Sequence, residues 1–411
     1  MCTPYISPKR KNNTAANSLL IGLLALGLAL GSCNRLQNVR PDDSGVFIKL
    51  LGGALDDRAF SIIENPDGSF TLVGTSTRAV IDANRNVQNS VIIRLDANGN
   101  PLWNENLSGY EGRSVAPLPN NQGFLVFGDI INERDTTSLY LIGTNAQGQE
   151  QWSRTYGLPS RNERGFSIVP APNNQYLLLG MTIAPVTNQT QMYAVRTDIE
   201  GNVLRERIYG FTGVSNNVGS IIQTNNGDVL WCGDTFPNLG TNSDARLVLT
   251  DSLLNLKWDF TYGGAGNETA RDVKQTFDGY IIVGSTETNS AGGRDVWLLK
   301  VDLGGQLIWQ RNYGGTANDE GFSVTPTRDG GFLIVGYTES KGQGGQDIWV
   351  IKTDFAGDPI WDKTFGGTRD DQGRAGIEPR NGGFLIIGTI FFENNQMMTV
   401  IRTDANGNIV K

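Results

Sequence analysis

Short apolar runs separated by Gly, Asp, Asn and Pro dominate the chain after residue 45. The stretch 309–361 holds four of them, GFSVTPT, GFLIVGYT, DIWVIKTD and PIWDKTF. Each run is rich in Val, Ile, Phe, Thr or Trp, which is typical of strands in an antiparallel meander. The stretch therefore predicts one four-stranded sheet. Such a sheet has two apolar faces, so its neighbours along the chain must cover them.

This unit recurs through residues 46–411 and can be counted by a turn of the form D-x-x-G-x-x-x-W. The turn, or a variant of it, falls 49 to 53 residues apart and begins at Asp96, Asn145, Asp198, Asp251, Asp302, Asp354 and Asp404. We expect the Asp to accept backbone N–H groups, the Gly to supply a positive φ, and the Trp to dock on the next copy. Arg205 and Lys411 stand where this Trp would be. Seven four-stranded copies with a period near 50 are typical of β-propeller blades.

The two ends of the chain decide between a closed ring and an open β-solenoid. The seventh copy ends just after its third strand, MMTVIRTD, whereas the domain opens with residues 46–53, which align with the fourth-strand sequence at 362–367. The first strand can therefore complete the last blade, which removes the exposed sheet edges. We predict an all-β fold, a seven-bladed β-propeller with four antiparallel strands per blade, closed by the N-terminal strand.

Two known groups share these motifs. The turn resembles the tryptophan-docking motif of PQQ-type propellers, which include the propeller lipoprotein of the outer-membrane barrel-assembly machinery. The longer unit, from D-G-G-F-L-I-V-G-Y-T to D-I-W-V-I-K-T-D, is similar to repeat propellers of surface and secreted proteins of Bacteroidota and archaea. The resemblance covers residues 46–411 and implies a fold rather than an activity. Quinoprotein dehydrogenases add adjacent cysteines and an eighth blade, which this sequence lacks, so we expect no bound quinone.

The first 45 residues follow a different pattern. Basic residues at positions 9–11 precede an apolar run at 19–30, and Gly31, Ser32 and Cys33 follow. A charged start, a short apolar stretch and small residues before a cleavage site are typical of a signal peptide. The ending L-G-S-C resembles the lipobox of bacterial lipoproteins, which implies cleavage before Cys33 and lipidation of its thiol. The alternative is an ordinary signal peptide with an incidental Cys.

Three segments follow from this interpretation. We expect a signal peptide at residues 1–32, a lipidated Cys33 with a polar tether at 33–45, and the propeller at 46–411. Asn34 replaces the Asp that retains lipoproteins in the inner membrane, so the resemblance implies the outer membrane, on either its periplasmic or its cell-surface face.

Charge and composition exclude several functions. The formal net charge is −8, and an anionic surface repels nucleic-acid backbones, so nucleic acid is not an expected partner. The chain has no His, which removes the usual base of Ser or Cys nucleophiles and the commonest transition-metal ligand. Cys232 lies in the apolar run Val-Leu-Trp-Cys and is expected to be a buried, inert thiol. We expect no cofactor, with Ca²⁺ as the one ion considered.

A patterned set of ionisable residues stands just before the first strand of each blade. In a propeller this strand is innermost, so the set is expected to ring one mouth of the central channel, where clustered carboxylates suit Ca²⁺ or a charged ligand. The alternative is that each acid caps its own turn or pairs with an Arg, and the repetition favours this second interpretation. The acids are Asp57, Glu163, Glu268, Asp319 and Asp371, replaced by Tyr110 and Asn216 in two blades, with Arg58, Arg113, Arg164, Arg271 and Arg374 nearby.

The loops between the second and third strands vary most from blade to blade. Apolar side chains in loops over a rigid scaffold are where a partner surface would be placed, although some of them are expected to fold back onto their blades. The candidates are Ile130, Ile131, Phe236, Phe391 and Phe392, with Val80 and Ile81 in the longest loop.

These features predict a monomeric, lipid-anchored outer-membrane propeller that binds a protein or peptide without catalysis. A glycan is the other ligand class considered, and the lipid is the only expected contact with the membrane. One alternative is a carbohydrate-active lyase or glycosidase that uses carboxylates at the channel mouth. It would show a non-repeating polar cluster and one carboxylate of raised pKa. The other alternative is an envelope-assembly factor, which rests on fold analogy alone.

Overall fold

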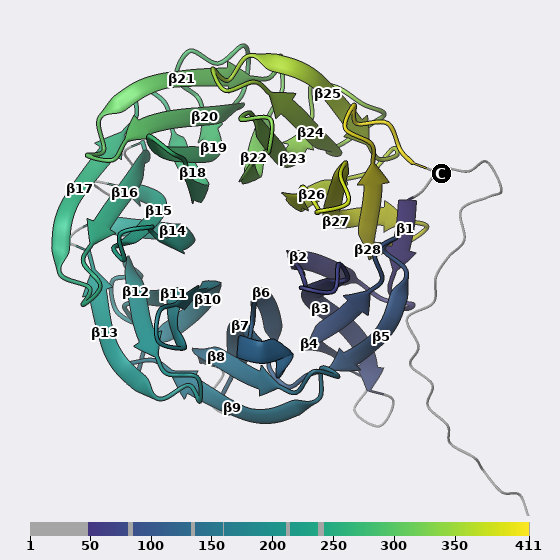
Figure 1. Cartoon of the computed structure of the whole chain (residues 1–411). Coiled ribbons are helices and arrows are strands. Elements are labelled where there is room, and N and C mark those ends of the chain that lie inside the picture. Colours follow the sequence, from purple (N-terminus) through teal and green to yellow (C-terminus); the bar gives the residue numbers. More distant parts are fainter. Residues whose placement is uncertain are drawn as a thin grey trace, which may run out of the picture. The chain divides into compact units, whose positions relative to one another are not determined.

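The described chain forms seven four-stranded antiparallel sheets around a central opening (Figure 1). The computed structural model describes residues 48–80, 85–132, 136–158, 160–210, 214–236 and 242–410, without the side chains of Val80, Arg85 and Asn86. Within these ranges the helical content is one 3-10 turn, η2 (Pro119–Asn121), and no helix is long and apolar enough to cross a membrane. The predicted all-β, seven-bladed propeller is confirmed. The predicted signal peptide, Cys33 and the tether lie outside the described residues.

The first four blades use the strands in chain order. Blade 1 consists of β2 (Asp57–Glu64), β3 (Phe70–Val80), β4 (Arg85–Leu95) and β5 (Pro101–Asn106). Blade 2 consists of β6 (Glu111–Pro117), β7 (Phe124–Ile131), β8 (Thr137–Thr144) and β9 (Glu150–Tyr156). Blade 3 consists of β10 (Asn162–Ala171), β11 (Gln175–Ile183), β12 (Thr190–Thr197) and β13 (Val203–Tyr209). Blade 4 consists of β14 (Ser215–Gln223), β15 (Val229–Phe236), β16 (Asp244–Thr250) and β17 (Leu256–Tyr262).

The remaining three blades follow the same order except at the end of the chain. Blade 5 consists of β18 (Glu268–Gln275), β19 (Gly279–Thr286), β20 (Asp295–Asp302) and β21 (Leu307–Tyr313). Blade 6 consists of β22 (Asp319–Pro326), β23 (Phe332–Thr338), β24 (Asp347–Thr353) and β25 (Pro359–Phe365). Blade 7 consists of β26 (Gln372–Ile377), β27 (Phe384–Phe392), β28 (Asn395–Thr403) and, from the start of the chain, β1 (Ile48–Leu51).

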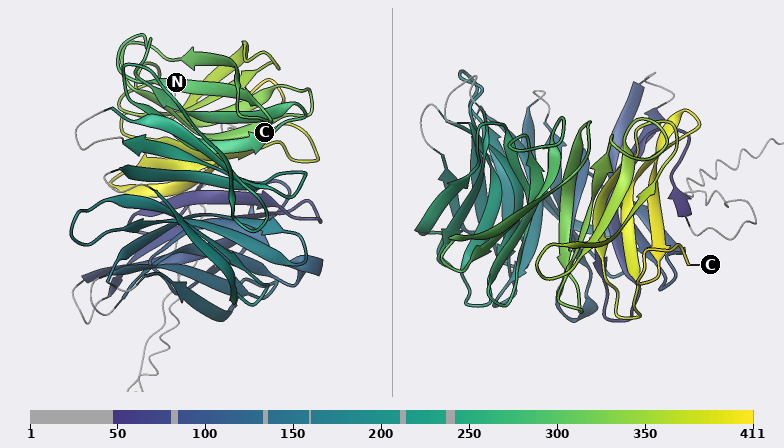
Figure 2. Two further views of the ribbon diagram at one scale, coloured as in Figure 1. Left: turned by 90° about the vertical axis from the view of Figure 1, so that its left-hand side faces the viewer. Right: turned by 90° about the horizontal axis from the view of Figure 1, so that it is seen from above.

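The strand β1 closes the ring, as predicted. It pairs antiparallel with β28, with Ile48 opposite Ile401 and Leu51 opposite Met398. The first strand of each blade lies nearest the opening and the fourth lies at the rim, while the strands run between two faces of the ring (Figure 2). We call the face with the hairpins between second and third strands, and with the loops entering each blade, the mouth face. The D-x-x-G-x-x-x-W turns lie on the other face, the turn face.

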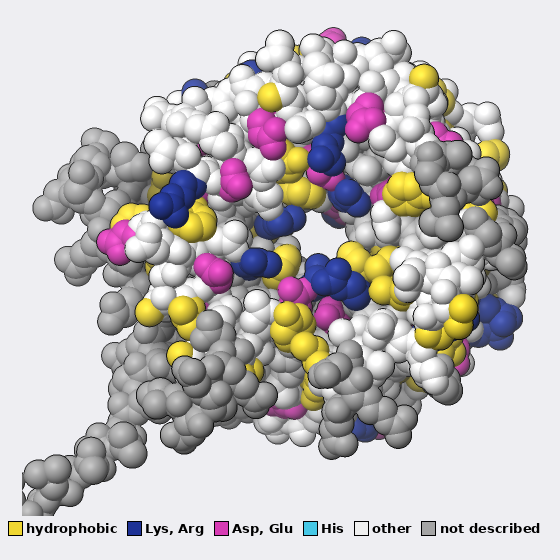
Figure 3. Space-filling view, turned by 180° about the vertical axis from the view of Figure 1, so that it is seen from behind, with side chains coloured by type: hydrophobic (Ala, Val, Ile, Leu, Met, Phe, Trp, Pro, Cys, Tyr) yellow, Lys and Arg dark blue, Asp and Glu magenta, His cyan; other side chains and the backbone are white. Residues whose placement is uncertain are grey.

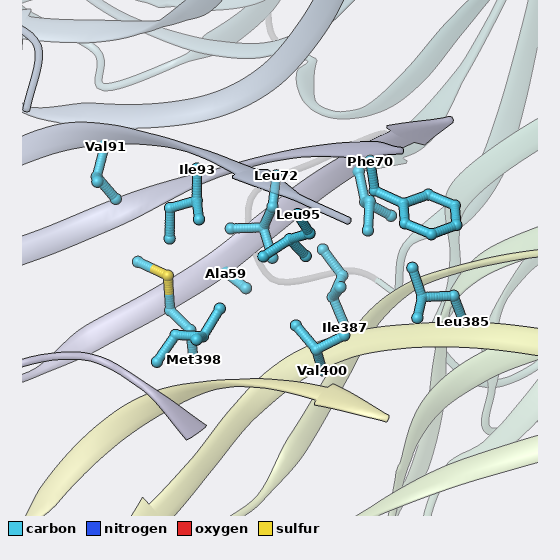
Figure 4. Close-up of a cluster of buried hydrophobic side chains, with 12 residues drawn as sticks. Ala59, Phe70, Leu72, Val91, Ile93, Leu95, Leu385, Ile387, Met398 and Val400 are labelled. Carbon is cyan, nitrogen blue, oxygen red and sulfur yellow. The ribbon is translucent and has the colours of Figure 1, made fainter. Parts of the chain in front are cut away.

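The apolar core is divided among the junctions between neighbouring blades. The two middle strands of a blade are buried along their length, as in β23 and β24, whereas the outer strand β25 is exposed on one side. The junction of blades 7 and 1 brings Phe70, Leu72, Leu385 and Met398 together (Figure 4), and Leu51 belongs to the same cluster. Each fully buried side chain of this size contributes about 1.5–3 kcal/mol, so a blade gains this burial only when both neighbours are present.

The predicted turn chemistry is also seen. In blade 1, Asp96 Oδ1 accepts the N–H groups of Asn98 and Asn100 at 2.9 and 2.7 Å. The Gly of the turn has a positive φ, 76° at Gly99, because the chain must reverse there within two residues. Because this Gly has no Cβ, it also leaves room for the Trp ring of the preceding blade.

A Trp on one blade lies directly against the turn Gly of the next. A Cβ added to Gly201, Gly357 or Gly407 would come within 2.9 Å or less of the ring atoms of Trp152, Trp309 or Trp361. Gly148 lies equally close to the ring of Trp103. The Trp ring therefore occupies the space of the missing side chain, which confirms the expected docking at these four seams. At the seam of blades 4 and 5, Gly305 instead faces Phe260.

Tyrosines add a polar contact at the same seams. The hydroxyls of Tyr156, Tyr262 and Tyr313 donate to the carbonyl oxygens of the turn residues Gly201, Gly305 and Gly357 at 2.6 to 2.7 Å. Tyr209 makes the same contact with the carbonyl oxygen of Leu254. These hydrogen bonds link the fourth strand of blades 2 to 5 to the turn of the following blade, a contact that the repeat motif alone did not predict.

The seam between blades 3 and 4 replaces both partners of the Trp–Gly contact. Blade 3 carries Arg205 where the Trp would be, and blade 4 carries Leu254 where the Gly would be. Leu254 keeps the positive φ of the turn, 61°, and its side chain is 1% exposed in the cluster with Tyr209 and Trp231. A docked Trp would overlap this leucine. The two departures from the motif therefore compensate each other: blade 3 lacks the Trp, and Leu254 of blade 4 fills the seam instead. We call this replacement the exchange.

This exchange predicts strong coupling between positions 205 and 254. Arg205→Trp alone should destabilise the protein by about 1–3 kcal/mol, because the indole meets Leu254 in a packed seam. Adding Leu254→Gly should relieve that clash and also the strain of a leucine at positive φ. Urea unfolding of the wild type, both single variants and the double variant gives the coupling energy, expected to be at least about 1 kcal/mol in favour of the double variant. Additive effects of the two substitutions would contradict the exchange.

Candidate binding site at the channel mouth

A break in the pairing of the first strand of every blade leaves a residue facing the central channel, with a side chain in every blade except blade 4, where Gly219 and Ser220 are both unpaired. In blade 1, Ala59 and Ser61 pair with consecutive residues of β3, so Phe60 is left out of the ladder. A bulge re-aims the extra residue away from its neighbours. All seven bulge positions line one cavity of about 520 Å³ along the channel: Phe60, Arg113, Phe166, Gly219, Arg271, Phe322 and Arg374.

Arginines and phenylalanines alternate around most of this bulge ring. The guanidinium carbon of Arg113 lies 5.4 Å from the ring centres of both Phe60 and Phe166. That of Arg374 lies 4.5 Å from the centre of Phe322. Each Phe presents a π-face to a neighbouring cation, which holds the guanidinium in place without neutralising it. Gly219 leaves a gap in the ring at blade 4.

A second cavity of about 390 Å³ shares Phe60, Arg113 and Arg374 with the first. Its wall adds the residues two positions before the bulge in four blades, which are two arginines, a glutamate and a glutamine: Arg58, Arg164, Glu111 and Gln372. Lys and Arg side chains surround the central opening when the molecule is viewed from behind (Figure 3). At the channel mouth, equivalent positions of different blades therefore carry different charges.

The cations of the channel differ in how they are neutralised. Arg271 pairs with Glu320 at 2.8 Å and Asp234 at 3.4 Å. Arg113 pairs with Glu111, and its Nε lies 3.5 Å from Asp129 Oδ1. Among the described residues, Arg58, Arg164 and Arg374 form no ion pair.

Burial and the surrounding charges together lower the pKa of Arg374 to about 10. Burial is the largest cause, Glu320 opposes it, and the neighbouring cations Arg113, Arg58 and Arg271 add to it. A guanidinium normally stays protonated far above this range. The charged forms of these neighbouring arginines therefore repel one another.

The five acids of the predicted ring lie behind the channel wall rather than in either cavity. Each carboxylate accepts the N–H of a residue in its own entering loop, and each is at most 1% exposed. The N···O distances are 2.6 Å (Gly53 to Asp57), 3.1 Å (Leu158 to Glu163), 2.8 Å (Gly264 to Glu268), 3.0 Å (Gly315 to Asp319) and 2.7 Å (Gly367 to Asp371). This is the geometry of loop caps. No group of three or more Asp, Glu or Cys that could hold a metal ion occurs within the described ranges, and Ca²⁺ binding stays a prediction.

Several of these caps lie beside a second carboxylate. Asp244, Asp295 and Asp347 begin the third strands of blades 4 to 6, next to the caps of the following blades. Burial raises the pKa of Asp295, and the negative charge of Asp319 raises it further. One oxygen of each of these two carboxylates has no hydrogen-bond partner among the described residues. The pair therefore costs stability when both members are ionised.

The candidate partner residues differ in exposure on the mouth face. Ile131 is 45% and Phe392 38% exposed, whereas Ile130 packs against the core between blades 1 and 2. Phe236 is half-buried. Phe391 is held by its backbone N–H, which bonds Asp371 at 2.5 Å, and by Arg369, 4.5 Å from its ring centre. Ile81 and the side chain of Val80 are not among the described residues.

Val186, in the hairpin between β11 and β12, is 92% exposed on the mouth face as well, and it is not among the predicted partner residues. Most other exposed apolar side chains lie elsewhere. They occupy the fourth strands and the turns on the turn face, and include Leu204, Leu256, Ile308, Phe355 and Ile360. The sequence carried the signal, because most of them stand within the D-x-x-G-x-x-x-W turns themselves, where the motif was interpreted only as a seam.

Two further groups bear on catalysis. The pKa of Asp129 is raised to about 6, chiefly by burial, with Arg113 opposing the shift and Glu111 adding to it. Asp129 is nevertheless 1% exposed, so its carboxylate does not reach the cavity. Cys232 is buried as expected, and burial raises the pKa of its thiol to about 12, which keeps it protonated and unreactive.

The paired carboxylates predict that Asp295→Asn stabilises the protein at neutral pH. The native pKa of Asp295 is raised above its unfolded value, so its carboxyl favours folding below about pH 4 and opposes it as pH rises through the native pKa. The amide removes this charge and can donate to Asp319. Melting temperatures should rise by about 2 °C at pH 7, the shift for roughly 1 kcal/mol, and the gain should vanish near pH 4.

Thermal melting between pH 4 and 8 checks this, with the exposed Asp358→Asn as the control. A variant that melts below the wild type at both pH values would show that the carboxylate is a needed cap rather than an electrostatic cost.

Comparisons with known proteins bear on the fold. No family model matches the chain. The regulatory protein FlaEY of Caulobacter vibrioides is 30% identical over 110 residues, which is 23% of this chain, and the chain spans only 12% of that protein's length.

Two solved structures are similar over most of the chain. The WD40 repeats of RRP9 superpose with a TM-score of 0.54 and 11% identity, covering 90% of this chain and 100% of that one. The structure of U3-55K gives a TM-score of 0.53 at 11% identity, covering 87% of this chain and 98% of that one. The chain therefore shares the β-propeller architecture of WD40-type proteins.

Proposed function

We propose that this chain is a lipid-anchored, outer-membrane binding module that holds a protein or peptide on its mouth face and performs no catalysis. The observation that carries the proposal is the contrast between the two parts of each blade. The blade bodies repeat, while the channel lining and hairpin ends on the mouth face change from blade to blade. A rigid scaffold with one irregular face is the usual arrangement of a recognition surface.

Exposure identifies the apolar part of that surface. Ile131 ends β7 in blade 2, and Phe392 ends β27 in blade 7. Both are on hairpins that rise beside the charged channel mouth. Exposed apolar groups beside a polar centre can bury area on a partner while the charges set its orientation. The WD40-type fold is compatible with such a use, but the likeness itself extends only to architecture.

The same geometry supports binding over catalysis. The channel lining varies between blades as a carbohydrate-active enzyme would require. However, the two carboxylates of raised pKa that pair with channel arginines, Asp129 and Asp234, are each 1% exposed behind Arg113 and Arg271. A general acid must come within hydrogen-bond reach of its substrate. Neither carboxylate meets this condition.

The partner surface is tested by the double variant Ile131→Ser, Phe392→Ser. Capture of a membrane-extract protein on the immobilised wild-type domain should be reduced at least about tenfold, as expected when two exposed anchors are lost from an interface. The matched control is Phe355→Ser, which removes a 75% exposed phenylalanine from the turn face. Circular dichroism should be unchanged in all variants. Equal recovery of the same partner by wild type and double variant would contradict the assignment of this face.

The anchor is tested separately. Cys33→Ser should move the full-length protein from the outer-membrane fraction to the soluble fraction, because the lipid is its only proposed membrane contact. Cys232→Ser is the control, since that thiol is buried in blade 4. A Cys33→Ser protein that still sediments with outer membranes after a high-salt wash would contradict the lipid anchor.

A further inference from the structure

We propose that the channel mouth is a binding site for a carboxylate group, held by the three unpaired arginines Arg58, Arg164 and Arg374. The carboxylate can belong to a free organic acid or to a side chain or chain end of a peptide. The site is distinct from the apolar hairpin ends, so it does not depend on the protein partner proposed above.

The three arginines come from one sector of the ring. Blades 7, 1 and 3 supply Arg374, Arg58 and Arg164, and blade 2, between the last two, supplies Arg113. All four line the same cavity of about 390 Å³, large enough for a small acid or one peptide side chain. Three separate blades thus each place one positively charged side chain in the wall of this cavity.

Neutral groups hold two of these arginines in position. Arg58 Nε donates to Gln396 Oε1 at 2.7 Å, and Arg374 donates to Gln372 Oε1. Arg374 also stacks on Phe322. Amides and aromatic rings orient a guanidinium while leaving its charge uncompensated, whereas elsewhere in the channel Arg271 is neutralised by two carboxylates. A charge that is oriented but not compensated is available to a ligand.

The surplus of positive charge is local. The whole chain carries a net charge of −8, so a cationic channel mouth is contrary to its composition. Grouping like charges in a partly desolvated channel costs stability, which is typical of binding sites rather than of scaffold. The pKa of Arg374 is lowered mainly by burial, and the neighbouring arginines add to this effect.

The other wall residues favour a carboxylate over phosphate. Glu111 and Asp370 both line the same cavity, and Asp129 lies just behind Arg113, so a second negative charge on the ligand would be repelled. A planar monoanion matches the fork of a guanidinium with two parallel hydrogen bonds. Thr389 and the amides of Gln372 and Gln396 border the rest of the cavity and suit a polar remainder.

Titration calorimetry at low salt with three probes tests the proposal: succinate, an N-acetylated glutamate amide and inorganic phosphate. Either carboxylate probe should bind the full mature protein, and the one that binds more tightly identifies the source as a free acid or a peptide side chain. Binding should weaken as salt is raised. Arg374→Gln and Arg58→Gln should each weaken it about tenfold or more, the loss expected for one charge-assisted hydrogen bond. Arg207→Gln, an exposed arginine on β13, is the matched control.

The melting temperature without ligand separates binding from a structural role. Removing one of several repelling cations should leave it unchanged or raise it for Arg374→Gln. No binding of either carboxylate probe, tighter binding of phosphate than of both, or equal affinities in wild type and Arg374→Gln would each overturn the proposal. A large fall in melting temperature, with unchanged affinity, would instead assign Arg374 to the scaffold.

Discussion

Burial of both faces of every sheet is the constraint on which the rest of this structure depends. A single blade has an apolar surface on each side, and the cores of this protein lie between blades rather than within them. An open stack of seven would leave two such surfaces and two strand edges in water. The pairing of β1 with β28 removes this loss, because it joins the first and last blades through the cluster around Leu51 and Met398. The blades are therefore stable only as a ring.

The seams show how a repeat can vary without losing this closure. Trp and Gly are complementary because the indole occupies the space of the absent side chain. At the seam between blades 3 and 4 the large residue has moved to the other partner, where Leu254 fills the gap and Tyr209 still bonds its carbonyl. Volume across the seam is conserved while the motif is lost in both blades. Packing density, and not the motif, is what the fold requires.

The channel positions, in contrast to the seams, are not fixed by packing between blades. Each bulge leaves at least one residue of the first strand outside the ladder, and this residue faces the channel. The seven positions hold Phe, Arg, Phe, Gly, Arg, Phe and Arg, a set that no seam dictates. The acids nearby stay repetitive because they close loops. Positions that hold the same kind of residue in most blades are thus structural here. Positions that differ between blades form the surface available for recognition.

Much of the fold could be predicted from the sequence, because apolar alternation, Gly-Asp turns and a period near 50 are local properties of the chain. Ring closure was predictable too, since the two chain ends carry complementary parts of one blade. The sequence also placed the acids beside the arginines, but it could not separate loop caps such as Asp319 from channel residues such as Arg374. That distinction depends on a one-residue bulge, which turns one side chain into the channel and leaves its neighbours in the wall. Only the tertiary structure decided it, because the bulge is defined by pairing between strands and the charge of the mouth by residues from blades far apart in the chain.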